Sequence, residues 1–352
     1  MRNVVLTIVV LFLTVSAYAI EPIKWFNGET LYWENDSFGI GRKSDRFYTQ
    51  GAKVSFLISP KNNPDWLKVR NGAFHLREAF CKHFCDSNKQ WKESVSFVFG
   101  QNFYTPENIL KAEPQPDDHP WAGYLYTGFA ESIVDENTQR DLHYLEGQVG
   151  VLGPAAGAHA TQYTIHIRFG FSDKDPQGWP NQFKNEPAFN FLYLRAHRFG
   201  NDTLDFVPQA GGTLGTIQTS LIAGATTRLG WHISGFPVST IRFAVTPNEN
   251  NLPHKVEAYV FAGAEERWVP FNAVLDGGFF RNGPKANGPK RFVDDLKVGA
   301  AFRIRALRLT YTVVDRGKEF ETPPGHVARQ RFGSWALTVE PFNSFRAGHW
   351  WQ

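Results

Sequence analysis

The stretch LKVGAAFRIRALRLTYTVV, from Leu296 to Val314, alternates apolar and polar side chains over two segments joined by a short turn. Strands of about ten residues with apolar side chains outward and basic or small side chains inward are typical of a transmembrane β-barrel. In the first segment the apolar face holds Leu296, Val298, Ala300, Phe302 and Ile304, and the other face holds Lys297, Gly299, Ala301, Arg303 and Arg305. In the second segment Leu307, Leu309, Tyr311 and Val313 alternate with Arg308, Thr310 and Thr312.

The same pattern recurs along the chain. Segments such as SVSFVFGQNFY, WAGYLYTGFAESIV, RDLHYLEGQVGVLG, FNFLYLRAHRFG, GTIQTSLIAGATTRLGWH and HKVEAYVFAGAEERWV mix aromatic with small or polar residues between turn signals. A soluble β-sandwich also has alternating strands. Arginine, threonine and glycine on the inner face, with Trp and Tyr near strand ends, favour the barrel. We therefore expect an all-β fold, a single antiparallel transmembrane barrel of about twelve strands. The last strand, SWALTVEPF, is expected to end at Phe342, before the tail NSFRAGHWWQ.

The first residues indicate the compartment. A basic start is followed by the apolar run Val4 to Leu13 and by Ala17-Tyr18-Ala19, a small-x-small cleavage site. This is the pattern of a secretory signal peptide over residues 1–19, which leaves residues 20–352 as the barrel domain. An anchoring helix would need about twenty apolar residues, more than this run provides. The net charge of +3 and the lack of a basic run give no support for nucleic-acid binding.

Cys81 and Cys85 lie in the stretch CKHFCDSNKQ, with His83 between them. One such cluster has too few ligands for a structural zinc site. In an exported protein a local disulfide is the better interpretation.

One segment departs from the period of two. GPAAGAHATQYTIHIRFG, Gly153 to Gly170, opens with Gly-Pro and small residues, and a short helix from about Ala155 is compatible with it. On a helix His159, Gln162 or Tyr163, and His166 would share one stripe, because residues three, four and seven apart face the same way. On a strand His166 would instead alternate with Ile165 and Ile167, and periodicity leaves both possibilities open.

Several polar motifs stand in a fixed order in the first half of the chain: END, DRFYTQG, FYTPENI, DDHPWAG, GVLGPAAG and GWPNQ. With these motifs the sequence resembles the outer-membrane lipid A 3'-O-deacylases, the LpxR family, from about Leu31 to Pro187. The resemblance implies a barrel of about a dozen strands, a Gram-negative outer-membrane location, and lipid A or lipopolysaccharide as the substrate. It also implies hydrolysis of the ester that carries the 3'-linked acyloxyacyl group, with Ca²⁺ as cofactor.

The resemblance also implies site residues. Asn35 and Asp36 match the family's Asn-Asp pair, and Thr49 matches the threonine of its Tyr-Thr-x-Gly motif. Lys111 matches a lysine five residues after Thr105-Pro106, and His166 matches the histidine that follows Gly-Pro. The family has an acidic residue shortly after this histidine. Ser172 stands at that position here, with Asp173 beside it, so whether Asp173 substitutes is open.

The chemical steps of ester hydrolysis explain why residues of these types would be needed. Histidine is the side chain whose pKa suits a general base near neutral pH, and no Gly-x-Ser-x-Gly elbow offers a serine nucleophile. We therefore expect His166 to activate water. Asp36 offers hard oxygen ligands for Ca²⁺, which would act on the ester carbonyl as a Lewis acid. Lys111 and Thr49 are expected to stabilise the oxyanion or to hold a lipid A phosphate.

Other polar residues have plainer interpretations. Asp45 and Arg46 are expected to form a structural ion pair or turn. His119, in DDHPWAG, is expected to be scaffold or a substrate contact, and His159 a neighbour of the site. Two alternative functions remain: a phospholipase, for which no Ser-His machinery is evident, and a non-catalytic porin-like barrel, which would need none of the proposed site residues together.

Overall fold

The computed structural model describes residues 26–40, 46–58, 76–170, 172–237, 240–242, 256–305, 307–322, 325 and 329–339. The predicted signal peptide, Asp45 and the chain after Val339, including the expected strand end at Phe342, lie outside these residues. Among the described helices none is long and apolar enough to cross a membrane.

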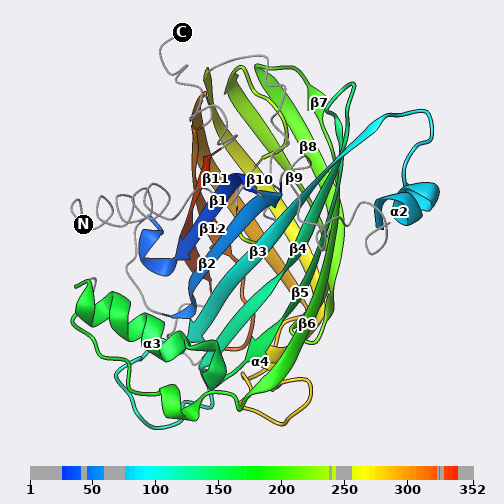
Figure 1. Cartoon of the computed structure of the whole chain (residues 1–352). Helices are drawn as coiled ribbons and strands as arrows, with labels where there is room; N and C mark the ends of the chain where they lie inside the picture. Colours follow the sequence, from blue (N-terminus) through cyan, green and yellow to red (C-terminus); the bar gives the residue numbers. More distant parts are fainter. Residues whose placement is uncertain are drawn as a thin grey trace.

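The strands form one antiparallel sheet that closes on itself, because β1 pairs with β13 and β6 pairs with β8 (Figure 1). This is a barrel of twelve long strands with one two-residue strand, β7, in addition, and it confirms the predicted fold. The strands are β1 Phe26–Asn35, β2 Phe47–Ile58, β3 Trp91–Thr105, β4 Ala122–Asp135, β5 Asp141–Leu152, β6 Glu186–His197, β7 Phe199–Gly200, β8 Leu204–Gly215, β9 Gln218–Trp231, β10 Val256–Asn272, β11 Phe292–Ile304, β12 Leu307–Arg316 and β13 Gln330–Val339.

Short helices lie outside the strands. One end of the barrel carries most of them and most of the long connections, and we call it the helical end (Figure 1). The other end, where β1 begins and β13 ends, is the terminal end. The helices of the helical end are η1 Asp36–Phe38, η4 Pro154–Ala156, α3 Ala158–Tyr163, η5 Thr164–Arg168, η6 Trp179–Asn181 and α4 Ala273–Asp276, whereas α2 Leu76–Phe84 follows β2 at the terminal end.

The alternation of β11 and β12 is as predicted. Leu296 and Phe302 face outward and are 52% and 51% exposed, whereas Arg303 and Arg308 face the lumen and are each 2% exposed. Val313 is the exception, since it was expected on the exposed face but is buried. Its neighbour on β13 is Gly333, against which Phe38 of η1 packs. The η1 turn therefore covers this part of the outer wall.

Of β3 and the strands that follow it, one is missing from the segments that the sequence predicted. β8 contains Pro208 and the pair Gly211-Gly212. Proline lacks a backbone N–H and glycine has no side chain to pack, so both weaken a strand pattern. β8 nevertheless pairs with β6 and β9, because the closed sheet supplies partners on both of its edges.

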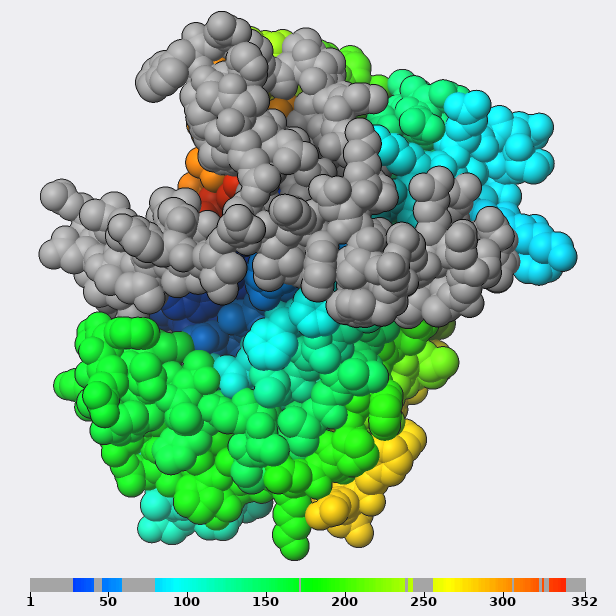
Figure 2. All heavy atoms as spheres, in the orientation of Figure 1, coloured from blue at the N-terminus to red at the C-terminus, as the bar shows by residue number. Residues whose placement is uncertain are grey.

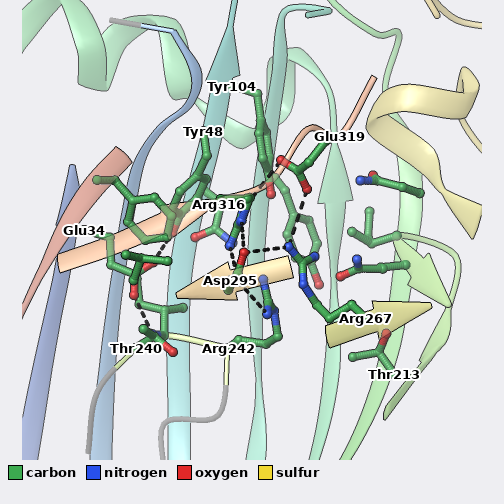
Figure 3. A pocket seen from close by; sticks show the side chains of 18 of the residues that line it. Glu34, Tyr48, Tyr104, Thr213, Thr240, Arg242, Arg267, Asp295, Arg316 and Glu319 are labelled. Carbon is green, nitrogen blue, oxygen red and sulfur yellow. Dashed lines mark hydrogen bonds and ion pairs between the residues drawn. The ribbon is translucent and has the colours of Figure 1, made fainter. Parts of the chain in front are cut away.

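The lumen is filled by charged side chains rather than left open. Lys53 and Glu146 form an ion pair at 2.6 Å with both side chains fully buried. Deeper toward the helical end, Asp295 lies among Arg267, Arg316 and Arg242 beside a cavity of about 110 Å³ (Figure 3). Pairing of this kind is what buried charges require.

Part of the connection from β9 to β10 also enters the lumen. Phe236 lies in a buried cluster with side chains of β3 to β9. The backbone N–H of Ile241 donates to Glu34 of β1 at 2.7 Å, and Arg242 reaches Glu265 at 2.7 Å. The described residues of this connection therefore pack inside the barrel.

The two remaining local predictions are resolved. Cys81 and Cys85 form the predicted disulfide. The segment after Gly153 is helical, through η4, α3 and η5, and not a strand. Gln162 and His166 lie on its buried stripe, whereas His159 and Tyr163 are exposed.

Candidate active site on the outer wall

The sequence-predicted residues of β1 and β2 meet on the outer face of the barrel at the helical end. On β1 Glu34 points into the lumen, toward Tyr48, so its successor Asn35 points outward. The pairing of β2 with β3 shifts register between Tyr48 and Gln50, which leaves Thr49 as an additional residue of a β-bulge. A bulge redirects a side chain and is common beside active sites. Here it brings Thr49 to the same outward face as Asn35 and Gln50.

Asn35 and Asp36 are held by the start of η1. The Asn35 side chain accepts a hydrogen bond from the backbone N–H of Ser37 at 2.8 Å, which caps the turn. Its amide nitrogen donates to Gln50 at 3.4 Å. Asp36 is fully buried, and its Oδ2 accepts from the backbone N–H of Arg46 at 2.7 Å. Asn35 thus positions the carboxylate that follows it.

Arg46 forms an ion pair with Glu107 at 3.3 Å, whereas Asp45, with which it was predicted to pair, lies outside the described residues. Arg46 also donates to the backbone carbonyl of Arg329 at 3.1 Å. These contacts tie the β1–β2 connection to the β3–β4 and β12–β13 connections. The hydroxyl of Thr49 shares a 2.7 Å hydrogen bond with that of Thr105, on the neighbouring strand β3.

The helix α3 lies directly on the outer face of β3 and β4. Gln101 of β3 donates to the backbone carbonyl of Ala156 at 2.6 Å. At Gly123 of β4 an added Cβ would lie 2.6 Å from the Cβ of Ala158, closer than van der Waals contact allows. Glycine and alanine therefore let the helix approach the wall closely. In Figures 1 and 2 the green helix lies beside the lower part of the blue strands, whose surface is recessed next to it.

His166 lies one turn beyond α3, in the π-helical segment η5, and is buried. Its Nδ1 lies 2.9 Å from the backbone carbonyl of Lys174. A carbonyl oxygen only accepts hydrogen bonds, so Nδ1 carries the proton and the lone pair of the neutral ring is on Nε2. The Lys174 carbonyl thereby fixes the orientation of the ring.

The residues at the position of the family's acidic residue, Ser172 and Asp173, follow η5 closely in the sequence. Asp173 is exposed, and the Ser172 hydroxyl accepts from the backbone N–H of Lys174 at 3.2 Å. The backbone carbonyl of Lys174 is thus the partner of Nδ1, which a motif based on side chains would not reveal. Strand periodicity likewise gave no sign of Gln101 and Gly123, which seat the helix.

Trp179 contacts the same buried face of the helix and bonds to Gln162. The indole N–H of Trp179, in η6, donates to the side-chain oxygen of Gln162 at 2.8 Å. His159 is exposed, with its ring 6.1 Å from that of Trp179, so it is a neighbour of the site as expected. Lys111 lies on the β3–β4 connection with its side chain exposed. Asn181 donates to the carbonyl of Ala112 at 2.6 Å, which fixes that loop against η6.

His119 belongs to the lumen rather than to this site. Its ring is buried and stacks on Tyr104 at 5.4 Å, with Phe47 and Phe320 around it. Burial lowers the pKa of His119 below its usual value, because the charged form would lose its hydration. The scaffold interpretation of His119 is therefore the one that its surroundings favour.

The sequence matches the family model described as "Outer membrane protein LpxR" over residues 5–340. The chain belongs to the LpxR family. It is similar in structure to LpxR from Salmonella typhimurium, with 20% identity, a TM-score of 0.67, and coverage of 89% of this chain and 99% of that one. The β-domain of the Bordetella autotransporter BrkA gives 7% identity, a TM-score of 0.41, and coverage of 90% and 98%. No curated protein matches.

As an LpxR family member the protein is an outer-membrane β-barrel, and its apolar outer face meets lipid. Trp231, near the terminal end of β9, and Trp268, toward the helical end of β10, are both exposed on this face. They mark the interfacial aromatic residues that the sequence predicted at strand ends. The helical segment that carries His166 thus packs on the membrane-facing wall and not in the lumen.

Proposed function

We propose that this protein is a carboxylic ester hydrolase of the outer membrane, which removes the 3'-linked acyloxyacyl group of lipid A. The observation that carries the proposal is the buried His166, oriented by the Lys174 carbonyl on a helix packed against the lipid-facing wall. An acylated lipid can reach a site in this position by lateral movement within the membrane.

The orientation of the barrel supports lipid A as the substrate. Outer-membrane barrels have short periplasmic turns and longer extracellular loops. In this chain most connections at the helical end are long, including those from β3 to β4, β5 to β6 and β10 to β11. The helical end then faces the outside, and the site lies at the level of the outer leaflet, where lipid A resides.

His166 acts as the general base in this proposal. Water bound near Nε2 transfers a proton to the ring and attacks the carbonyl carbon of the ester. The proton held on Nδ1 keeps the resulting imidazolium hydrogen-bonded to Lys174, so the ring does not rotate during the step. The imidazolium then returns a proton to the leaving alkoxide of the sugar as the tetrahedral intermediate collapses.

Calcium is proposed as the cofactor, held by the Asp36 carboxylate. Calcium takes six to eight oxygen ligands, from carboxylates, carbonyls and waters. Among the described residues no three histidine, cysteine or acidic side chains converge, so the other ligands would be backbone and amide oxygens, water and substrate. When bound, the ion supplies a Lewis acid for the ester carbonyl. Because Asp36 would be the single carboxylate ligand, we expect the site to bind calcium weakly.

The remaining residues have supporting roles. Asn35 positions Asp36 through the cap of η1, and the Thr49 hydroxyl offers a hydrogen bond toward the developing oxyanion. Lys111, on its exposed loop, is suited to a lipid A phosphate. The proposal needs no role for Asp173, because the Lys174 carbonyl already orients the ring of His166.

The two alternative functions have less support. A phospholipase of the serine type needs a Ser-His pair, and the sequence offers no Gly-x-Ser-x-Gly elbow for the serine. A porin needs an open lumen, but this one holds buried ion pairs such as Lys53–Glu146 and residues of the β9–β10 connection. Neither alternative explains a base oriented on the outer wall.

The decisive experiment is mass spectrometry of lipid A from cells that express the wild type or His166→Ala, with calcium or with chelator. We expect loss of one acyloxyacyl unit only for the wild type with calcium. His159→Ala, an exposed histidine on the same helix, is the matched control and should retain activity. Unchanged lipid A in every sample would reject the proposal, and a fully active His166→Ala would reject the base.

A further inference from the structure

The outer wall at the terminal end of β4 and β5 is unlike the rest of the lipid-facing surface. Glu131 and Ile133 of β4 and His143 and Leu145 of β5 point outward by the strand alternation, yet all four are buried. Farther along the same face Val149 is half exposed. Something of the protein's own chain therefore covers this patch of the wall.

The helix α2 supplies part of the cover. The ring of Phe80 lies 5.2 Å from that of His143 and 5.6 Å from that of Tyr193, on β6. The ring of Trp91, where β3 begins, lies 5.3 Å from His143. Figure 1 shows α2 outside the barrel and beside its wall. A carboxylate and an imidazole facing hydrocarbon would be costly, and the cover removes them from it.

The free face of α2 is itself amphipathic. Phe84 is 61% exposed, although its ring stacks on Phe80 at 4.8 Å. Lys82 and His83, the two residues before it, are exposed as well. The Cys81–Cys85 disulfide joins the last turn of the helix to the residue after it, and so it restrains the position of Phe84.

We propose that α2 is an interfacial helix that rests on the barrel wall and inserts Phe84 into the periplasmic leaflet of the outer membrane. The partner is glycerophospholipid, with its acyl region against Phe84 and its phosphate groups near Lys82 and His83. Three features favour lipid over a protein partner. The exposed aromatic ring continues the lipid-facing wall of β5 and β6, where Phe191 and Val149 are exposed. Lys82 and His83 precede it directly, and basic residues are common in helices that bind at membrane surfaces. The helix also lies at the terminal end, which is the periplasmic one.

The test replaces Phe84 by the photo-crosslinking analogue p-benzoylphenylalanine, which preserves an aromatic ring at an exposed position. Irradiated cells are fractionated, the folded barrel is recognised by its heat-modifiable migration in gels, and adducts at position 84 are identified by mass spectrometry. The same analogue at Phe191, on the lipid-facing wall, is the positive control. Asn88, in the exposed polar turn after α2, is the negative control.

We expect a glycerophospholipid adduct at position 84, several-fold more abundant than at position 88. A lipid A adduct at position 84 would overturn the leaflet assignment and with it the proposal. A protein adduct would show that the helix docks a partner instead. A folded protein with a lipid adduct at position 191 but none at position 84 would also overturn it. None of these outcomes depends on the deacylase activity.

Discussion

A methyl group added at Gly123 should impair catalysis while leaving the barrel folded. The new Cβ would lie 2.6 Å from the Cβ of Ala158 and 3.2 Å from that of Ala156, whereas ordinary contacts begin at 3.4 Å. The helix must then move away from the wall by about 1 Å, and a displacement of that size at a reactive group costs about 100-fold in rate. Overpacking of this kind costs about 1–3 kcal/mol in stability. His166 moves with the helix, because η5 continues α3 without a break.

The assay is the time course of acyloxyacyl loss from lipid A in isolated outer membranes, scaled to the amount of heat-modifiable barrel. Gly147→Ala is the matched control, since an added Cβ there meets nothing within 4 Å on the next strand. The double variant Gly123→Ala/Ala158→Gly should recover most of the activity, because it moves the same methyl group across the contact. Wild-type rates for Gly123→Ala would refute the idea that close packing of α3 on β4 positions the base.

Three further predictions concern the lumen and the metal. Glu146→Leu should destabilise the barrel by about 3–5 kcal/mol, because it leaves the Lys53 ammonium buried without its carboxylate. The double variant with Lys53→Met should recover most of the lost stability. Urea titration of the folded fraction in lipid vesicles measures both effects. Burial lowers the pKa of His119, so the unfolded chain binds a proton more readily, and the stability of the barrel should fall as pH drops below about 6.5. His119→Phe should abolish this part of the pH dependence of stability. The same slope of stability against pH in wild type and variant would contradict the prediction. Asp36→Asn should raise the calcium concentration needed for half-maximal activity, while Asp173→Asn, an exposed carboxylate near His166, should leave the calcium titration as in the wild type.

The barrel was predictable because a closed membrane sheet imposes its pattern on every strand. Leu296 and Phe302 meet lipid while Arg303 and Arg308 face the interior, so apolar and polar residues alternate visibly in the sequences of β11 and β12. The alternation predicts exposure wrongly where other parts of the protein, rather than lipid, cover the outer face of a strand. Val313 is covered by η1, and β8 is a strand in spite of Pro208, since its neighbours on both sides hold it in the sheet.

The sequence predicted which residues form the candidate site but not how they are arranged. The ordered motifs pointed to Asn35, Asp36, Thr49, Lys111 and His166, and the functional roles of these five remain predictions. Periodicity could not choose between strand and helix after Gly153. The helix packs on β4 where Gly123 faces Ala158, a contact between two elements that has no signal in the local sequence.

By itself, the sequence determined the outward and inward faces of strands such as β11, because alternation is a local property of the chain. It also favoured the local disulfide that the structure contains, since Cys81 and Cys85 are close in sequence. Only the tertiary structure decided that a bulge turns Thr49 outward, and that the backbone of Lys174 orients His166. These arrangements arise from hydrogen bonds and close contacts between segments distant in the chain or irregular in backbone, which no periodic pattern encodes.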